Sequence, residues 1–307
     1  PIDEQNVVLT VSASFDASAC ELTIEAALNA GFPEDTLLLE EPMAALYSWL
    51  ADSGDDWRKQ LKLNDIILVC DVGGGTTDFS MIMVKEEDGN LTLERIAVGN
   101  HILVGGDNMD MTLAHYSRNK FLERNLELDA WQSVALWHSC RKVKEILLSG
   151  TAPEVYPVAA LGRGSKLVGG TISVELERDI IRNLLVDGFF PKCSLADKPI
   201  RKTASGFREL GLPFESETAI TKHLASFISG QKSATGEILK PTHILFNGGV
   251  FKAELFKSRI VEIINSWFEP DSSIKMLMDK FDLDFAVCRG AAYYSKCKKG
   301  KGIRIRG

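Results

Sequence analysis

Residues suited to chemistry are concentrated in one short stretch, where an apolar run at 66–70 leads to Asp71 and then to three successive glycines at 73–75. Backbone N–H groups at a glycine-rich turn can converge on an anion, because glycine tolerates positive φ and close approach. A carboxylate at the end of a buried strand can hold a magnesium ion through the ion's water molecules. The stretch therefore predicts a phosphate-binding turn, and its candidate ligands are Asp71, Gly73, Gly74, Gly75, Thr76 and Thr77.

The turn joins two predicted strands, which distinguishes it from the two best-known glycine motifs. A P-loop requires a lysine after its glycines and then a helix, but the first lysine after the turn is Lys85. The dinucleotide fingerprint requires a glycine where Asp78 stands, and also a helix. A glycine-rich hairpin turn without a ligand is the alternative. The acid and the two hydroxyl groups beside the glycines argue against it.

The composition is that of an ordinary globular protein, with 45% hydrophobic and 25% charged residues in 307. This length is sufficient for two domains. A net charge of −7 argues against binding to nucleic acid. No apolar run approaches the roughly 18 residues that a membrane helix requires. The six cysteines and five histidines lack metal-ligand spacing, so the sequence predicts no zinc site, and the cysteines favour a cytoplasmic setting.

The two ends of the sequence give separate expectations. The first residues, PIDEQ, include neither an initiator methionine nor a signal-like apolar segment. We therefore expect the chain to be a fragment of a longer protein. The last residues, KCKKGKGIRIRG, are basic, and we expect them to form a solvated end.

Hydrophobic periodicity predicts the alternating strands and helices that position these residues, which is typical of α/β proteins. A strand–helix–strand–helix block comes first, and its first helix is predicted to begin at the capping-box pattern Ser18–Glu21. A three-stranded meander over 66–98 follows. The remaining predicted elements are a small hairpin at 153–160 and 166–171, a strand at 243–246, a loop at 190–213, and helices at 107–125, 130–149, 174–187, 216–229, 250–267 (ended by Pro270) and 285–296.

Six segments, taken in order, resemble the nucleotide-binding domain of the 70-kDa heat-shock protein chaperone family, a branch of the actin and sugar-kinase superfamily. They are VVLTVSASF, LLLEEPMAA, ILVCDVGGGTTDFS, LVGGDNMD, ILFNGGVFK and AVCRGAAYY. The resemblance covers nearly the whole chain and is weakest between residues 187 and 240. It implies an actin-like ATPase (ribonuclease-H-like) α/β fold with a complete second lobe and a partial first lobe. The closing residues look like those of a divergent bacterial member.

The resemblance also implies a division into lobes. Residues 1–61, with 281–307 returning to them, would form the partial first lobe. Residues 62–104 and 241–280 would form the core sheet of the second lobe, and 105–240 its helical subdomain. The family's first phosphate hairpin and catalytic lysine precede this region, and we expect both to be missing from these 307 residues.

Site roles follow from the same resemblance. Asp71 would hold the waters of a magnesium ion, Glu41 would orient the attacking water or the waters of the metal, and Thr76 would complete the catalytic group. The family usually has Glu where Arg141 stands and Arg where Lys252 stands, so the adenine pocket would be altered. The implied nucleotide contacts are Gly73, Gly74, Gly75, Thr76, Thr77, Gly105, Gly106, Asp107, Arg141, Lys144, Gly248, Gly249 and Asp284.

The resemblance implies a chaperone ATPase domain that binds ATP or ADP with magnesium. Its nucleotide state would control a client-binding domain elsewhere in the parent protein, and the isolated fragment would be inactive. The expected partners are an adenine nucleotide and, through the parent, co-chaperones and unfolded client proteins, but neither nucleic acid nor membrane. Two alternatives stay open: a non-catalytic nucleotide-sensing or scaffold module, and another actin-superfamily ATPase or sugar kinase.

Overall fold

The computed structural model describes residues 2–13, 15–160, 172–200, 216–269, 273–277, 282–300 and 302–306. Its strands are β1 (Val8–Val11), β2 (Leu37–Glu40), β3 (Ile66–Val72), β4 (Thr77–Glu87), β5 (Asn90–Val98), β6 (Val155–Ala160), β7 (Ile172–Glu177), β8 (His243–Asn247) and β9 (Lys275–Met276). Its α-helices are α1 (Ala17–Asn29), α2 (Glu41–Ser53), α3 (Trp57–Gln60), α4 (Gly106–Glu123), α5 (Ala130–Leu148), α6 (Arg178–Phe189), α7 (Ile220–Gly230), α8 (Glu254–Ser266) and α9 (Ala286–Lys298). Short 3₁₀ turns are η1 (Ile2–Glu4), η2 (Gly54–Asp56) and η3 (Gly249–Lys252).

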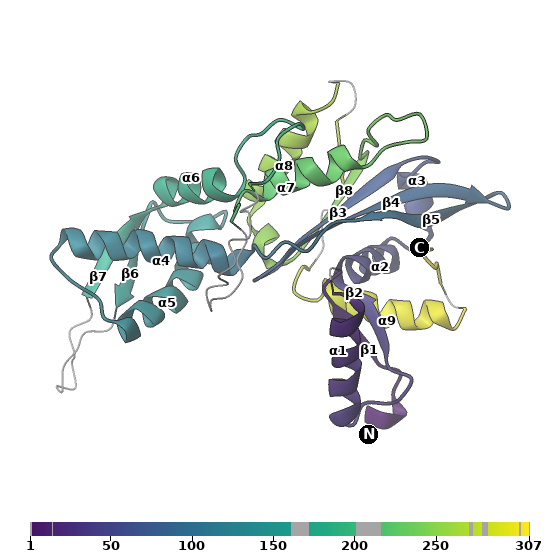
Figure 1. Ribbon diagram of the computed structural model, residues 1–307, viewed down its shortest axis with the longest axis horizontal. Coiled ribbons are helices and arrows are strands. Elements are labelled where there is room, and N and C mark those ends of the chain that lie inside the picture. Colours follow the sequence, from purple (N-terminus) through teal and green to yellow (C-terminus); the bar gives the residue numbers. More distant parts are fainter. Residues whose placement is uncertain are drawn as a thin grey trace, which may run out of the picture.

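A five-stranded sheet in the order β5-β4-β3-β8-β9 forms the centre of the molecule (Figure 1). Strands β3, β4 and β5 are antiparallel neighbours, so the predicted meander is confirmed. Strand β8 joins parallel to β3, with Asp71 opposite Asn247. Every residue of β3 is buried, which explains why its sequence is a continuous apolar run rather than an alternating one. The mixed α/β class predicted from the sequence is confirmed.

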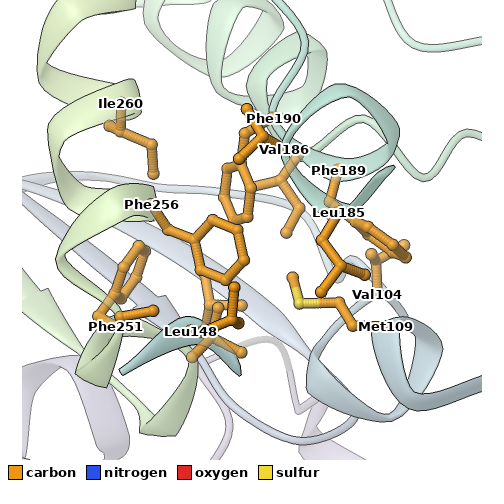
Figure 2. Close-up of a cluster of buried hydrophobic side chains, with 14 of the residues drawn as sticks. Val104, Met109, Leu148, Leu185, Val186, Phe189, Phe190, Phe251, Phe256 and Ile260 are labelled. Atoms are coloured by element: carbon orange, nitrogen blue, oxygen red, sulfur yellow. The ribbon is translucent and has the colours of Figure 1, made fainter. Parts of the chain in front are cut away.

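The two faces of β3 belong to two different cores, because successive side chains of a strand point to opposite faces. Leu68 and Cys70 face a core built with α4 to α8. Figure 2 shows part of it, where Phe256 of α8 lies beside Phe190 and Leu148. Ile67 and Val69 face a second core built with α2 and α9.

Helices α2 and α9 lie beside β1 and β2 beneath the central sheet (Figure 1). The predicted pairing of the first two strands is confirmed, since β1 and β2 are parallel neighbours with Val8 opposite Leu37. Gly290 of α9 lies directly against the backbone of α2, where a Cβ atom would overlap the Ala44 carbonyl. The small side chains at 44–45 and 290–292 thus allow the two helices to approach closely.

Several element boundaries differ from the predictions; the helix predicted at 216–229, for example, begins at Ile220. The N-cap of α1 is Asp16, whose carboxylate accepts from the Ala19 N–H at 2.8 Å, so the prediction at Ser18 is wrong. The predicted helix at 174–187 begins only at Arg178, because residues 172–177 alternate and pair with β6. The predicted helix at 250–267 begins at Glu254 after a 3₁₀ turn. The predictions for 166–171, for 201–213 and for Pro270 lie outside the described residues.

The basic C-terminal tail is not a solvated end within its described part. The Arg95 N–H donates to the Arg306 carbonyl at 2.7 Å, and the Arg306 N–H donates to Leu93 at 2.9 Å, so the tail extends the sheet at β5. Ile305 is buried, and its N–H donates to the Tyr47 hydroxyl at 3.0 Å. The arginines face outward while the isoleucine joins the second core.

None of the helices in the described ranges is long and apolar enough to cross a membrane. All six cysteines are free thiols.

Candidate functional site

The turn between β3 and β4 is fastened to the start of α4 by its carbonyl groups. The carbonyls of Gly73 and Gly74 accept from the N–H groups of Gly106 and Asp107 at 3.0 and 2.7 Å. Gly105 makes this approach possible, because a Cβ atom there would lie 2.5 Å from the Gly74 carbonyl oxygen and 2.7 Å from that of Gly73. The first amides of α4 therefore hold the turn, rather than a ligand.

The amides of the turn glycines differ in their hydrogen bonding. The Gly73 N–H donates within the turn to the Thr76 carbonyl at 2.9 Å. Gly74 and Gly75 are exposed, and among the described residues their N–H groups have no protein acceptor. None of the three turn glycines has positive φ, so the expectation of a left-handed turn is wrong. The exposed amides nevertheless remain free to donate to an anion.

The two threonines after the glycines have different environments. Thr76 is half-buried in the turn. Thr77 is fully buried, and its hydroxyl donates to the Val104 carbonyl at 2.7 Å while its N–H donates to Ile102 at 2.9 Å. Thr77 therefore anchors the segment that leads into α4, and the predicted nucleotide contact by this side chain does not fit the structure.

A row of polar side chains crosses the end of the central sheet on the face covered by α2. Asp71 of β3 lies opposite Asp78 of β4 on one side and Asn247 of β8 on the other. The Asn247 amide donates to Asp71 Oδ2 at 2.8 Å, and the Ser12 hydroxyl donates to Asp78 Oδ2 at 2.9 Å. Glu41, the first residue of α2, lies close enough to interact with both aspartates.

These acids destabilise one another in their ionised forms. The pKa of Asp71 is raised to about 7, chiefly by burial and further by the charges of Glu41 and Asp78, while the Asn247 hydrogen bond opposes the rise. Burial and Asp78 also raise the pKa of Glu41. A bound cation would relieve this repulsion, so the acids fit a magnesium ion. Within the described residues, no group of three or more His, Cys, Asp or Glu could ligate a metal directly, so contact through the ion's waters is the fitting mode.

A cavity of about 500 Å³ lies beside the turn, between α4, α5, η3 and α8. The predicted acids Glu41 and Asp71 are not part of its wall and lie on the opposite face of the sheet. The turn therefore lies between the acid row and the cavity. A single ligand placed at the turn could contact both. Seven residues predicted to contact a nucleotide line the cavity: Gly73, Gly74, Gly106, Asp107, Arg141, Lys144 and Gly249.

Charged side chains on α4 and α5 form one wall of the cavity. Arg141 bonds Asp107 through Nη2 at 2.5 Å and Asp110 through Nε at 3.2 Å. Lys144 lies 2.7 Å from Asp110 and donates to the Gly106 carbonyl at 2.9 Å. Asp110 is buried and Lys144 is largely buried, whereas the Arg141 side chain is about half exposed, so only Lys144 is withdrawn from solvent.

The opposite part of the cavity is apolar. Met109, Leu148 and Phe256 are buried and converge there from three different helices (Figure 2). At the rim, Lys252 is paired with Asp284 at 2.5 Å, which places the predicted acid Asp284 at the mouth of the cavity rather than inside it. A cavity with an apolar slot, a charged wall and free amides at one end suits a flat aromatic group joined to phosphates.

Gly248 lies directly against Asp71 of the acid row. It has a φ of 90°, which L side chains rarely adopt, and a Cβ atom there would lie 2.8 Å from Asp71 Oδ1 and overlap the Val72 carbonyl. Its role is therefore to let β8 pass the end of β3, while Gly249 beyond it lines the cavity.

Five residues of the site received no role from the sequence: Ser12, Asp78, Asp110, Glu145 and Asn247. Asp110 lies three residues after Asp107, so helical spacing could have placed both acids on one face. Asn247 is a polar residue that ends a buried strand before two glycines, which was a usable signal. Ser12 and Glu145 gave none, because their proximity depends on the packing of distant segments.

The mixed α/β fold and the site at the end of β3 are consistent with a domain of the chaperone class. The sequence profile of the Hsp70 protein family matches residues 3–194, and the chain therefore belongs to the Hsp70 family.

Individual relatives agree with this assignment. The chain is 35% identical over 144 residues to the chaperone protein HscA homolog of Shewanella piezotolerans, and 33% identical over 158 residues to the chaperone protein HscA of Proteus mirabilis. It is 26% identical over 296 residues to a heat shock protein homolog of Encephalitozoon cuniculi. These matches cover 47%, 48% and 94% of this chain, but only 21%, 23% and 40% of the relatives. The chain thus spans less than half the length of the relatives it matches.

Proposed function

We propose that this chain binds ATP or ADP with magnesium, and that its parent protein hydrolyses ATP to control a client-binding domain outside these 307 residues. One observation carries the proposal. Exposed turn amides, a row of coupled acids and a cavity with an apolar slot meet at the end of the same strand, β3. Membership of the Hsp70 family supports the same reading.

Residues on both faces of the sheet take part in this proposed function. The amides of Gly74 and Gly75 donate to phosphate oxygens, with Thr76 beside them. Asp71 would accept from a water molecule of a bound magnesium ion, and Glu41, at the start of α2, would accept from the attacking water. Bound magnesium would supply positive charge beside the phosphate oxygens. The adenosine part lies in the cavity between α5 and η3.

The lobe assignment is part of this proposal. The close packing of α9 on α2 supports the idea that residues 1–61 and 281–307 belong to one lobe, with 62–104 and 241–280 as the core sheet of the other and 105–240 as its helical subdomain. We also propose a cytoplasmic setting and a bacterial source. Co-chaperones and unfolded proteins are the proposed partners of the parent, since two relatives are named as chaperones.

Calorimetric titration of the parent protein with ADP, in magnesium and in EDTA, tests the binding part of the proposal. We expect Asp71→Ala to keep the fold and magnesium-free binding but to lose the gain in affinity that magnesium gives. Identical magnesium titrations for wild type and Asp71→Ala would contradict the assigned role. A phosphate-release assay then distinguishes an ATPase from a nucleotide sensor, which would bind without turnover.

A further inference from the structure

Asn247 ends β8 directly beside Asp71. The two residues are register partners on neighbouring parallel strands, and the Asn247 amide donates to Asp71 Oδ2 at 2.8 Å. Both are buried, at 2% and 6% exposure. On its other side Asp71 faces Asp78. Asp71 therefore has one neighbour in the row that repels its charge and one that donates a hydrogen bond to it.

Packing alone does not explain an asparagine at this position. Every other residue of β8 is buried, and Ile244 and Leu245 show that apolar side chains suit the strand. Within the described part of the chain, Asn247 Oδ1 has no hydrogen-bond partner. A buried polar atom without a partner is unfavourable for folding. An apolar residue would avoid that cost, so the value of the amide lies in its contact with Asp71.

The contact confines the whole carboxylate. Oδ2 is held by the Asn247 amide, while Oδ1 lies over Gly248, where even a Cβ atom would approach within 2.8 Å. Beyond Gly248 the chain enters η3, whose residues Gly249 and Val250 line the cavity. A single hydrogen bond therefore ties the acid at the end of β3 to the segment that forms the cavity wall.

We propose that Asn247 is a positioning residue that fixes the orientation of the Asp71 carboxylate and so couples magnesium to the nucleotide bound in the cavity. Asn247 acts through Asp71 and touches no ligand. The role rests on the proposed function, because the part that Asp71 plays with magnesium is itself proposed there.

The test compares ADP affinity in magnesium and in EDTA, by calorimetry, for four variants of the parent protein: Asn247→Leu, Asp71→Ala, the double variant, and Ser80→Ala. Leucine removes the amide at similar size. Ser80 is the matched control, since its hydroxyl is also buried without a partner on the same face of the sheet but does not touch Asp71. We expect Asn247→Leu to lose roughly tenfold of the magnesium-dependent gain in affinity, the scale of one hydrogen bond to a charged group.

The double variant shows whether Asn247 acts through Asp71. In the Asp71→Ala background, Asn247→Leu should cause no further loss, and Ser80→Ala should match wild type throughout. Equal weakening in magnesium and in EDTA, or additive effects in the double variant, would show a merely structural role and overturn the proposal. If wild type binds no ADP at all, the proposed function itself fails. Normal wild-type binding with an unaffected Asn247→Leu overturns only the positioning role.

Nuclear magnetic resonance keeps the proposal testable if Asn247→Leu fails to fold. The side-chain amide protons of Asn247 should exchange slowly with water in wild type, because one of them is buried in the bond to Asp71. They should exchange fast in Asp71→Ala. Equal exchange in the two proteins would overturn the contact on which the proposal stands.

Discussion

Arg141 determines the charge of the cavity wall on α4 and α5. Its guanidinium lies between Asp107 and Asp110, while Lys144 pairs with Asp110 and donates to the Gly106 carbonyl. Both carboxylates raise the pKa of Arg141, so it stays fully charged. Its planar group offers donors and a stacking surface to whatever occupies the cavity.

Arg141→Ala should weaken ADP roughly tenfold but pyrophosphate much less. The adenosine part would occupy the cavity that Arg141 lines, whereas pyrophosphate would bind at the turn amides. Competition calorimetry with both ligands measures the difference. Lys142→Ala is the control, because Lys142 is exposed and does not line the cavity. Equal weakening of the two ligands would instead assign Arg141 to the solvated surface.

The raised pKa of Asp71 makes the stability of the fold depend on pH. The Asp71 carboxyl has a pKa of about 7 in the folded state, against an ordinary value of 3.8. Between these two pH values it binds more protons in the folded state than in the unfolded state. Its contribution to stability is therefore complete below pH 3.8 and is lost as the pH rises to about 7. The side chain of Asp71→Asn cannot ionise. Between pH 4 and pH 8, the free energy of unfolding of this variant should therefore rise relative to that of wild type by up to about 4 kcal/mol. Urea unfolding in EDTA measures the difference. A constant difference across this range would contradict the shift.

Single residues could be predicted from sequence where their chemistry was distinctive in its local context. The glycines and Asp71 stood out because a buried strand led into them. Thr77 was misread, since its hydroxyl is used by Val104, a contact that local spacing does not show. The position of Asn247 at the end of a buried strand marks it in the sequence, but its pairing with Asp71, like that of Asp78, depends on the register of three strands, which only the assembled sheet provides.

At the scale of elements, the meander and the first strand pair were predictable because their periodicity is strong and their connections are short. The helix prediction is wrong for 174–177, since the apolar residues there also suit the helix that follows directly at Arg178. The sequence also does not show which glycine adopts positive φ. Positive φ occurs at Gly248, where the chain passes from β8 into η3, and not at Gly74 in the hairpin turn. A Cβ atom at Gly74 would make only ordinary contact with Asp107.

Gly290→Ala should destabilise the protein, although alanine normally favours a helix. The gain in helix propensity is about 1 kcal/mol, whereas a Cβ atom would overlap the Ala44 carbonyl, and such overpacking costs about 1–3 kcal/mol or more. Gly188→Ala is the matched control, since Gly188 lies in α6 with open space around it and should gain about 0.5–1 kcal/mol. Chemical denaturation of both variants measures these signs. A stabilised Gly290→Ala would mean that α2 and α9 are not in close contact.

At the scale of the whole molecule, the arrangement of distant segments was beyond the sequence. The cavity draws its wall from the turn, α4, α5, η3 and α8, which span residues 73 to 256. The tail at 302–306 pairs with β5 and buries Ile305 because its isoleucines alternate with arginines, a strand pattern hidden within a run of positive charge. The positive charge of the tail predicts a solvated end, but the alternation of apolar and charged side chains correctly indicates a strand.

The isolated 307-residue chain should fold and bind ATP weakly, without hydrolysis above background. The resemblance implies that two hairpins on facing lobes would enclose the triphosphate, with the turn at 73–76 as one of them. That turn offers two free amides on one side of the phosphates, and Glu41 and Asp71 add acids but no cation. Losing one transition-state donor costs about 3–4 kcal/mol, or roughly a hundred- to thousand-fold in rate, and an opposing hairpin supplies several. Calorimetry and a phosphate-release assay on the chain test this expectation. Turnover comparable to that of an intact chaperone motor would mean that the catalytic residues lie elsewhere in the described fold.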